Sequence, residues 1–138
     1  MQYLTPENVL VIHAKLIDET GGLHGVRDLN LLISITERPK TSFGGQERYP
    51  TIFEKVATYL DGFVRYHVFI DGNKRTGIAA SARFLFINGY EFSVSNEEME
   101  KFVLEVAIKK LGIAEIVPWF EKHSSRKQKI TNSRSPAS

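Results

Sequence analysis

The stretch that organises this 138-residue sequence is His67-Val68-Phe69-Ile70-Asp71-Gly72-Asn73-Lys74-Arg75-Thr76. Runs with helical spacing of apolar residues stand on both sides of it, at 51–66 and at 73–88. The second run is apolar on nearly all sides, which is typical of a helix buried at the centre of a bundle. We therefore expect the stretch to connect two core helices and to place its polar residues where the second helix begins.

Two cations, Lys74 and Arg75, fall in the first turn of the helix predicted from residue 73. The helix dipole is positive at that end, so each charge costs about 0.3 kcal/mol or more unless an anion lies there too. Free backbone N–H groups at a helix start bind phosphate, and Gly72 lets the backbone approach it closely. Asn73 can donate its side-chain amide to the same anion. The pattern indicates a phosphate site.

Two other residues of the stretch add chemistry to such a site. Asp71 offers a hard oxygen ligand for Mg²⁺, which phosphate sites commonly use. His67 belongs to the residue type that acts as a general base near neutral pH. His67 is therefore the candidate catalytic residue, and Asp71 is the candidate metal ligand.

Simpler interpretations of the same residues remain open. Asp71 or Asn73 alone would cap the helix, and the two cations would then reach into solvent. A cap needs one polar residue, whereas this stretch holds several, and the combination favours a functional site. Phe69 and Ile70 are expected to anchor the stretch in the core.

Capping and stop signals divide the rest of the chain into helices. Thr5-Pro6 has the composition of a helix start, and Gly21-Gly22 has that of a helix end. Thr51 and Ser95 each begin a capping box that a glutamate completes three residues later. The predicted helices cover about residues 5–20, 28–38, 51–66, 73–88, 95–111 and 113–122.

Three segments fall outside these helices. Residues 39–50 are rich in Gly and Pro and form either a binding loop or a solvated connector. Residues 90–94 are expected to form one short extended piece. The chain after residue 123 is polar and basic, so we expect one domain at 1–123 and a disordered tail at 124–138.

The composition is that of a globular domain and excludes several classes of protein. The absence of cysteine rules out a disulfide framework, a thiolate metal site and a cysteine nucleophile. No apolar run approaches the roughly 20 residues that span a bilayer, and the N-terminus lacks signal-peptide features, so we expect a cytoplasmic protein that does not bind membranes. The net charge is +2, but residues 124–138 carry +4, which leaves 14 basic against 16 acidic residues before them. This distribution argues against nucleic-acid binding.

The pattern His-x-Phe-x-Asp-Gly-Asn-x-Arg resembles that of Fic-domain proteins, and Asn-Lys-Arg-Thr within it resembles the death-on-curing, or Doc, branch. The glycine turn 21–25 and Arg65, two residues before His67, are similar to that branch as well. The resemblance covers about residues 4–122. It implies an all-α fold, a compact Fic/Doc-type helical bundle of about six helices around a buried central helix.

The resemblance also implies a role for each residue of the motif. In Fic enzymes the motif histidine, here His67, deprotonates a hydroxyl of the target protein, and the acidic residue, here Asp71, holds Mg²⁺. Backbone amides form an anion hole for the phosphates of ATP or another NTP, and the segment 36–50 is similar to a flap that aligns the target. The predicted nucleotide- and phosphate-binding residues are Arg65, Gly72, Asn73, Lys74, Arg75 and Thr76.

Two departures from the pattern concern the group that is transferred. AMP-transferring members have a second glycine where this chain has Lys74, and a second arginine where it has Ile78. Lys74 would fill and charge the space that the phosphate enters, which in the Doc branch goes with a reversed nucleotide. The departures favour transfer of the γ-phosphoryl group to a hydroxyl of a host protein, with a translation elongation factor as the expected target class. The alternatives are a Fic-type protein adenylyltransferase and a non-catalytic Fic-fold binding module.

Regulation is expected to come from a separate protein. Many Fic proteins carry an inhibitory helix with a Ser/Thr-x-x-x-Glu-Gly/Asn motif. The nearest run here, at 93–98, has Glu98 in place of Gly or Asn and overlaps the capping box at Ser95, so we interpret it as a helix start. The resemblance therefore implies a toxin of a toxin–antitoxin system, restrained by an antitoxin protein.

Overall fold

Six α-helices make up most of residues 1–127, the part of the chain that this computed structural model describes. The all-α fold class predicted from the sequence is confirmed, because the strands in this part are only two or three residues long. No helix within it is long and apolar enough to cross a bilayer. The helices are α1 Pro6–Thr20, α2 Leu29–Glu37, α3 Ile52–Arg65, α4 Asn73–Ile87, α5 Asn96–Lys109 and α6 Ile113–His123.

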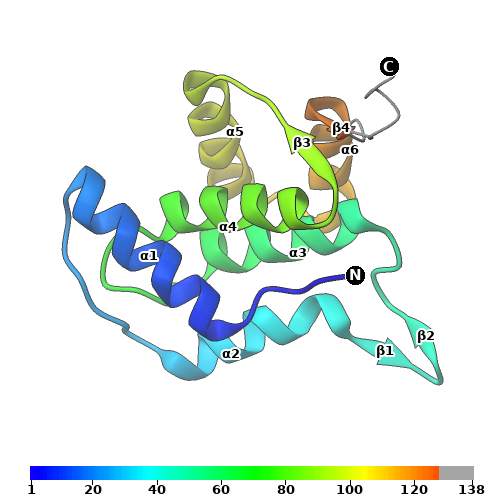
Figure 1. The fold of residues 1–138 in the computed structure, drawn as a ribbon, viewed down its shortest axis with the longest axis horizontal. Helices are drawn as coiled ribbons and strands as arrows, with labels where there is room; N and C mark the ends of the chain where they lie inside the picture. The colour runs from blue at the N-terminus through cyan, green and yellow to red at the C-terminus, as the bar shows by residue number, and fades with distance from the viewer. Residues whose placement is uncertain (128–138) are drawn as a thin grey trace, which may run out of the picture.

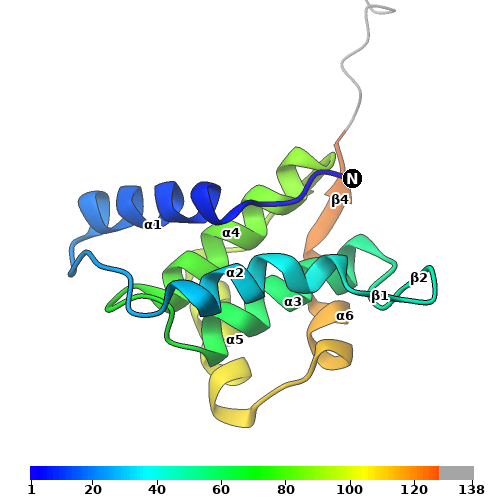
Figure 2. The same ribbon diagram turned by 90° about the horizontal axis from the view of Figure 1, so that it is seen from below.

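Helix α3 occupies the centre of the fold, with α4 running beside it (Figures 1 and 2). Every residue from 55 to 63 is buried, and α2, α4, α5 and α6 all pack against this helix. The sequence pattern assigned the central position to the helix at 73–88, and that assignment is wrong. Helix α4 leaves part of its surface exposed, including Lys74 and Arg83.

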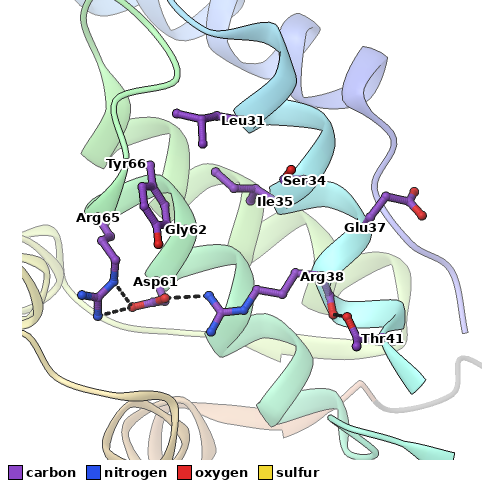
Figure 3. Close-up of a pocket in the computed structure, with 10 residues that line it drawn as sticks. All are labelled: Leu31, Ser34, Ile35, Glu37, Arg38, Thr41, Asp61, Gly62, Arg65 and Tyr66. Carbon is purple, nitrogen blue, oxygen red and sulfur yellow. Dashed lines mark hydrogen bonds and ion pairs between the residues drawn. The ribbon is translucent and has the colours of Figure 1, made fainter. Parts of the chain in front are cut away.

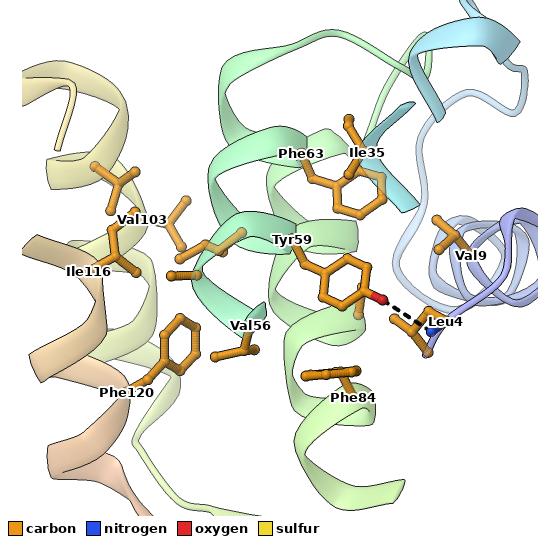
Figure 4. Close-up of a cluster of buried hydrophobic side chains, with 14 of the residues drawn as sticks. Leu4, Val9, Ile35, Val56, Tyr59, Phe63, Phe84, Val103, Ile116 and Phe120 are labelled. Atoms are coloured by element: carbon orange, nitrogen blue, oxygen red, sulfur yellow. Dashed lines mark hydrogen bonds between the residues drawn. The ribbon is translucent and has the colours of Figure 1, made fainter. Parts of the chain in front are cut away.

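Two glycines let the central helices approach one another closely. A β-carbon on Gly77 of α4 would lie 3.1 Å from Cβ of Phe63, and one on Gly62 of α3 would lie 2.8 Å from Cγ2 of Ile35. The close approach brings aromatic side chains from several helices into one core, where the Tyr59 ring packs edge-on against Phe84 at 4.9 Å (Figure 4). This packing fixes the position of the end of α3 relative to the start of α4.

The helix starts follow the capping signals of the sequence. Thr5 and Thr51 each accept a hydrogen bond from the backbone N–H three residues on, at 3.1 Å, and each capping box is reciprocal. Ser95 accepts from the N–H of Glu98 at 3.1 Å, so the run at 93–98 is a helix start, as predicted. These local bonds explain why the helix boundaries could be predicted.

The segment between α2 and α3 contains a small β-hairpin that the sequence did not reveal. A 3₁₀ turn, η1 Arg38–Lys40, leads into strands β1 Ser42–Phe43 and β2 Gln46–Glu47, which pair antiparallel. The connecting glycines, 44 and 45, both have positive φ, as the tight turn requires. Strands of two residues are too short to show an alternating pattern.

The end of the described chain pairs with the segment that precedes α5. Strand β3 Tyr90–Phe92 runs antiparallel to β4 Ser124–Arg126, with Phe92 opposite Ser124. The extended piece predicted at 90–94 is thus a strand, and the predicted boundary after residue 123 is wrong, because the next residues belong to the fold. The remainder of the predicted tail, 128–138, lies outside the described residues.

Candidate active site

The active-site loop, which we define as residues 66–72 between α3 and α4, is held by the connection between α1 and α2. Val26 forms an antiparallel bridge with Phe69, and the carbonyl oxygen of Val68 accepts from the N–H groups of Arg27 and Asp28 at 2.7 and 3.0 Å. The active-site loop has no regular secondary structure of its own, and these hydrogen bonds pair it with residues 26–28 as in a β-sheet. The conformation of the loop therefore depends on a segment some 40 residues earlier in the chain.

Only one of the two predicted core anchors of this loop is buried. Phe69 is fully buried, as expected, whereas Ile70 is 57% exposed. The Ile70 N–H donates to the carbonyl oxygen of Gly25 at 3.1 Å, and its side chain lies over that glycine. Successive residues of an extended segment point to opposite faces, so the pairing that buries Phe69 turns Ile70 outward.

Asn73 closes the loop by binding the backbone of Phe69 twice. Its Oδ1 accepts from the Phe69 N–H at 2.8 Å, and its Nδ2 donates to the Phe69 carbonyl oxygen at 2.9 Å. Among the described residues 1–127, no side chain caps α4. The simple interpretation that Asp71 or Asn73 serves as a helix cap is therefore wrong, and one N–H of the Asn73 amide remains for a ligand.

His13 of α1 packs against the active-site loop. Its ring is buried, stacks on Phe69 with centroids 3.7 Å apart, and donates from Nε2 to the carbonyl oxygen of Asp71 at 2.8 Å. Sequence analysis gave His13 no role. It stands four residues from both Val9 and Ile17 on the buried face of α1, and this spacing was the available signal.

The Asp71 side chain is held by two backbone N–H groups. Oδ2 accepts from Leu23 at 3.1 Å and Oδ1 accepts from Gly72 at 2.8 Å. These hydrogen bonds, from Leu23 first and Gly72 second, lower the pKa of Asp71, so the carboxylate is ionised at neutral pH. Each oxygen keeps a lone pair, and a single ionised carboxylate suits Mg²⁺, which takes its other ligands from phosphate and water.

Arg75 reaches back from α4 to the end of α1. Its Nη1 donates to the Gly21 carbonyl oxygen at 3.0 Å and to the Thr20 hydroxyl, and its Nη2 lies 3.8 Å from Oδ1 of Asp71. The carbonyl end of a helix is negative, so it suits a cation. The structure thus places Arg75 beside Asp71, and the end of α1 orients its guanidinium.

The start of α4 presents backbone donors to a pocket of about 300 Å³. Gly72, immediately before the helix, has a left-handed conformation with φ +77°, and a β-carbon there would lie 3.0 Å from Ile17. Within residues 1–127, no hydrogen-bond acceptor faces the N–H groups of residues 73–75. Uncapped N–H groups at a helix start are anion donors. The pocket is lined by Val64, His67, Ile70, Asp71, Gly72, Asn73, Lys74 and Arg75.

The remaining predicted site residues divide into two groups. His67 and Lys74 are both exposed and both line the pocket. Thr76 is fully buried, its hydroxyl has no partner among the described residues, and it does not line the pocket. Arg65 is not brought to this pocket. Its guanidinium pairs with Asp61 one turn earlier in α3, at 2.9 Å.

Fold and site together define a small all-helical protein that has a helix start without a side-chain cap, and a histidine and a carboxylate on the loop before it. The model of the family described as "Fic/DOC family" matches residues 3–85, which include α1 to α3 and most of α4. The chain belongs to the Fic/DOC family, in its Doc branch.

Two curated relatives carry the Doc name. The protein "Toxin Doc" of Mycolicibacterium smegmatis is 38% identical over 92 residues, which cover 67% of this chain and 68% of that protein. The protein "Protein kinase doc" of Escherichia phage P1 is 34% identical over 97 residues, which cover 70% of this chain and 76% of that protein.

Proposed function

We propose that this chain is a Doc-like toxin that transfers the γ-phosphoryl group of ATP, or another NTP, to a hydroxyl side chain of a host protein. The observation that carries the proposal is the uncapped start of α4, whose free N–H groups face a pocket shared with His67, Asp71 and Lys74. The names of the two relatives, a toxin and a protein kinase, support the same activity.

His67 would act on the target hydroxyl. A nitrogen of its imidazole takes the hydroxyl proton while the hydroxyl oxygen forms a bond to the γ-phosphorus. The bond from that phosphorus to the bridging oxygen breaks, and the nucleoside diphosphate leaves. The exposed position of His67 at the edge of the pocket lets a protein surface reach it.

The other residues of the pocket would bind and orient the nucleotide. The N–H groups at the start of α4 and the charges of Lys74 and Arg75 would bind phosphate oxygens, and Asp71 would hold Mg²⁺. When bound, Mg²⁺ neutralises negative charge on the phosphates. Since the end of α1 and the turn that follows it already hold Arg75 and Asp71, little reorganisation is needed on binding.

Two residues favour phosphoryl over AMP transfer. Lys74 lines the pocket at the helix start, where a glycine would leave room for a phosphate to enter deeply. Ile78, one turn further along α4, offers no charge to clamp a second phosphate. Transfer of AMP is the alternative reaction at the same site.

The proposed regulation and target rest on the membership of the family. We propose that a separate antitoxin restrains the toxin in the cytoplasm, because the run at 93–98 is an ordinary helix start and not an inhibitory motif. A translation elongation factor is the proposed class of target.

Labelled ATP tests the reaction. The protein would be incubated with cell lysate, Mg²⁺ and ATP that carries the label on either the α- or the γ-phosphate. We expect label in a target protein from γ-labelled ATP only, and none with the His67→Ala variant. Label from the α-phosphate would show AMP transfer instead. If neither label is transferred and His67→Ala leaves toxicity unchanged, the enzymatic proposal is wrong.

A further inference from the structure

A second pocket, of about 720 Å³, lies between α2 and the last turns of α3 (Figure 3). It shares no lining residue with the active-site pocket. Val64 and His67 line the active-site pocket, whereas Arg65 and Tyr66 line this one, so the two pockets lie on either side of the end of α3. The lining residues are Leu31, Ser34, Ile35, Glu37, Arg38, Thr41, Asp61, Gly62, Arg65 and Tyr66.

Two arginines meet one buried carboxylate in this pocket. Asp61 has a side-chain exposure of 5%, and it accepts from Nη1 of Arg38 at 2.7 Å on Oδ2. On Oδ1 it accepts from Nε and Nη2 of Arg65 at 3.2 and 2.9 Å. Both carboxylate oxygens therefore accept hydrogen bonds. The cluster of two arginines and one aspartate has a net charge of +1.

The spare donors of the two arginines remain accessible. Their side chains are 33% and 41% exposed, for Arg38 and Arg65 respectively, and each guanidinium has N–H groups that Asp61 does not use. The other acid that lines the pocket, Glu37, pairs with Lys40 at 2.8 Å, so it does not cancel the excess charge. One arginine would be enough for an ion pair that only connects the end of α2 to α3. The presence of a second arginine at the same carboxylate indicates a site for an anion.

The rest of the lining suits a carboxylate on a short aliphatic stem. Leu31 and Ile35 provide an apolar wall, the Tyr66 ring stands at the rim, and Ser34 adds a hydroxyl (Figure 3). Arginine binds carboxylates through parallel N–H groups, and an aliphatic stem gains from the apolar wall. These are the requirements of an aspartate or glutamate side chain.

We propose that this pocket selects the protein substrate by binding an acidic side chain close to the hydroxyl that is modified. The proposal rests on the proposed function, since it assigns the second pocket to the target of His67. The two pockets flank one helix end, and a helix is about 10 Å across, so an extended target would place the acid about three residues from the hydroxyl. Arg38 and Arg65 are specificity-determining residues in this scheme.

A pair of synthetic peptides tests the pocket directly. Each peptide has a central threonine with glycine and serine spacers, and carries either glutamate or glutamine three residues to each side of the threonine. Binding to the full chain would be followed by NMR, including the Nε–H signals of Arg38 and Arg65. We expect the glutamate peptide to shift both signals and to bind at least about tenfold more tightly than its glutamine counterpart. Equal affinities, or no binding by either peptide, would overturn the proposal.

Two variants test whether Arg38 is responsible for binding the glutamate peptide. Arg38→Gln should lower the affinity for the glutamate peptide to that for the glutamine peptide, whereas Arg83→Gln, on the exposed surface of α4, should leave it unchanged. Equal losses in both variants would contradict the proposal. Because the peptide pair is compared on the wild-type protein too, the test stands even if Arg38→Gln fails to fold.

Two further measurements separate this proposal from others. If ATP, and not the glutamate peptide, shifts the Arg38 and Arg65 signals, the pocket belongs to the nucleotide and the proposal is wrong. Transfer of γ-label in lysate is measured separately. A failure of that transfer would reject the proposed function while peptide binding, which needs no transfer, still reports on the pocket.

Discussion

Gly22 lies so close to Asp71 that a β-carbon on Gly22 would stand 2.6 Å from Oδ2 of the carboxylate. The next residue, Leu23, donates its backbone N–H to that same oxygen. The turn after α1 therefore contacts the carboxylate of Asp71 closely. The φ of Gly22 is +120°, a backbone conformation that favours glycine. The glycine turn that resembles the Doc branch has a physical reason in this contact.

The Gly22→Ala variant should lose γ-phosphoryl transfer by about 100-fold, because the new methyl group displaces Asp71 from its donors. Gly21→Ala is the matched control. Gly21 also has a positive φ, of +88°, but its added β-carbon would meet nothing within 4 Å. Transfer rates and melting temperatures of both variants would be compared. Equal loss of activity in the two variants would show that backbone strain alone, and not the contact with Asp71, matters.

Replacement of Asn73 should destabilise the protein, because its side chain both accepts from and donates to the Phe69 backbone. Asn73→Ala removes both bonds to Phe69 and should lower the free energy of unfolding by about 2 kcal/mol. Asn73→Asp keeps the acceptor for the Phe69 N–H, but it sets a carboxylate oxygen against the Phe69 carbonyl oxygen and should cost at least as much. Urea unfolding at neutral pH measures both. If the alanine variant is as stable as wild type, the side chain does not hold the loop.

Lys74→Ala should reduce transfer of γ-label by about 10- to 100-fold, because one of the charges at the proposed phosphate site is lost. Its stability should stay within about 0.5 kcal/mol of wild type, since the side chain is exposed. Lys101→Ala, an exposed position on α5, is the control and should transfer at the wild-type rate. Full activity in Lys74→Ala would remove the main reason for preferring phosphoryl transfer.

The hairpin should depend on the buried Lys55. Its Nζ donates to Glu47 of β2 at 2.6 Å and to the Pro39 carbonyl oxygen at 3.2 Å. Glu47→Ala leaves a buried cation without its counter-charge and should lower the free energy of unfolding by about 1 to 3 kcal/mol. Adding Lys55→Met should restore part of this loss, because the charge is then absent. Strictly additive effects in denaturant unfolding of the two single variants and the double variant would show that the pair is not coupled.

Tyr59 should make stability fall at alkaline pH. Burial raises the pKa of Tyr59 to about 12, against an offset from the hydrogen bond of the Leu4 N–H to its hydroxyl oxygen. Between pH 10 and 12 the unfolded chain loses this proton while the folded chain keeps it, so stability falls with rising pH, by about 2 kcal/mol over the range.

Tyr59→Phe provides the comparison for this titration. The variant loses the bond from Leu4 and should be about 1 kcal/mol less stable than wild type at pH 7. It carries no phenol, so the order should reverse near pH 12. Thermal or denaturant unfolding from pH 7 to 12 measures both curves, and parallel curves would contradict the assigned shift.

Much of the fold could be predicted because its signals are local. The capping residues Thr5, Thr51 and Ser95 act within three residues of their partners, so the starts of α1, α3 and α5 could be found in the sequence. The extended piece at 90–94 could be predicted as well, but the strand pairing of the two short sheets could not. Strand β4 exists because residues 124–126 meet β3, which lies more than 30 residues earlier.

Within the site, the sequence by itself determined the residues of the loop and the start of α4, because they are neighbours in the chain and their charges conflict with the helix dipole. Only the tertiary structure decided what each of them contacts. It brought His13 and Leu23 to Asp71, whereas the pairing of Arg65 with Asp61 is an i, i+4 contact within α3 whose spacing is present in the sequence. The reason is physical: a hydrogen bond between residues about 50 apart depends on how the helices pack, and no pattern within one helix records that packing.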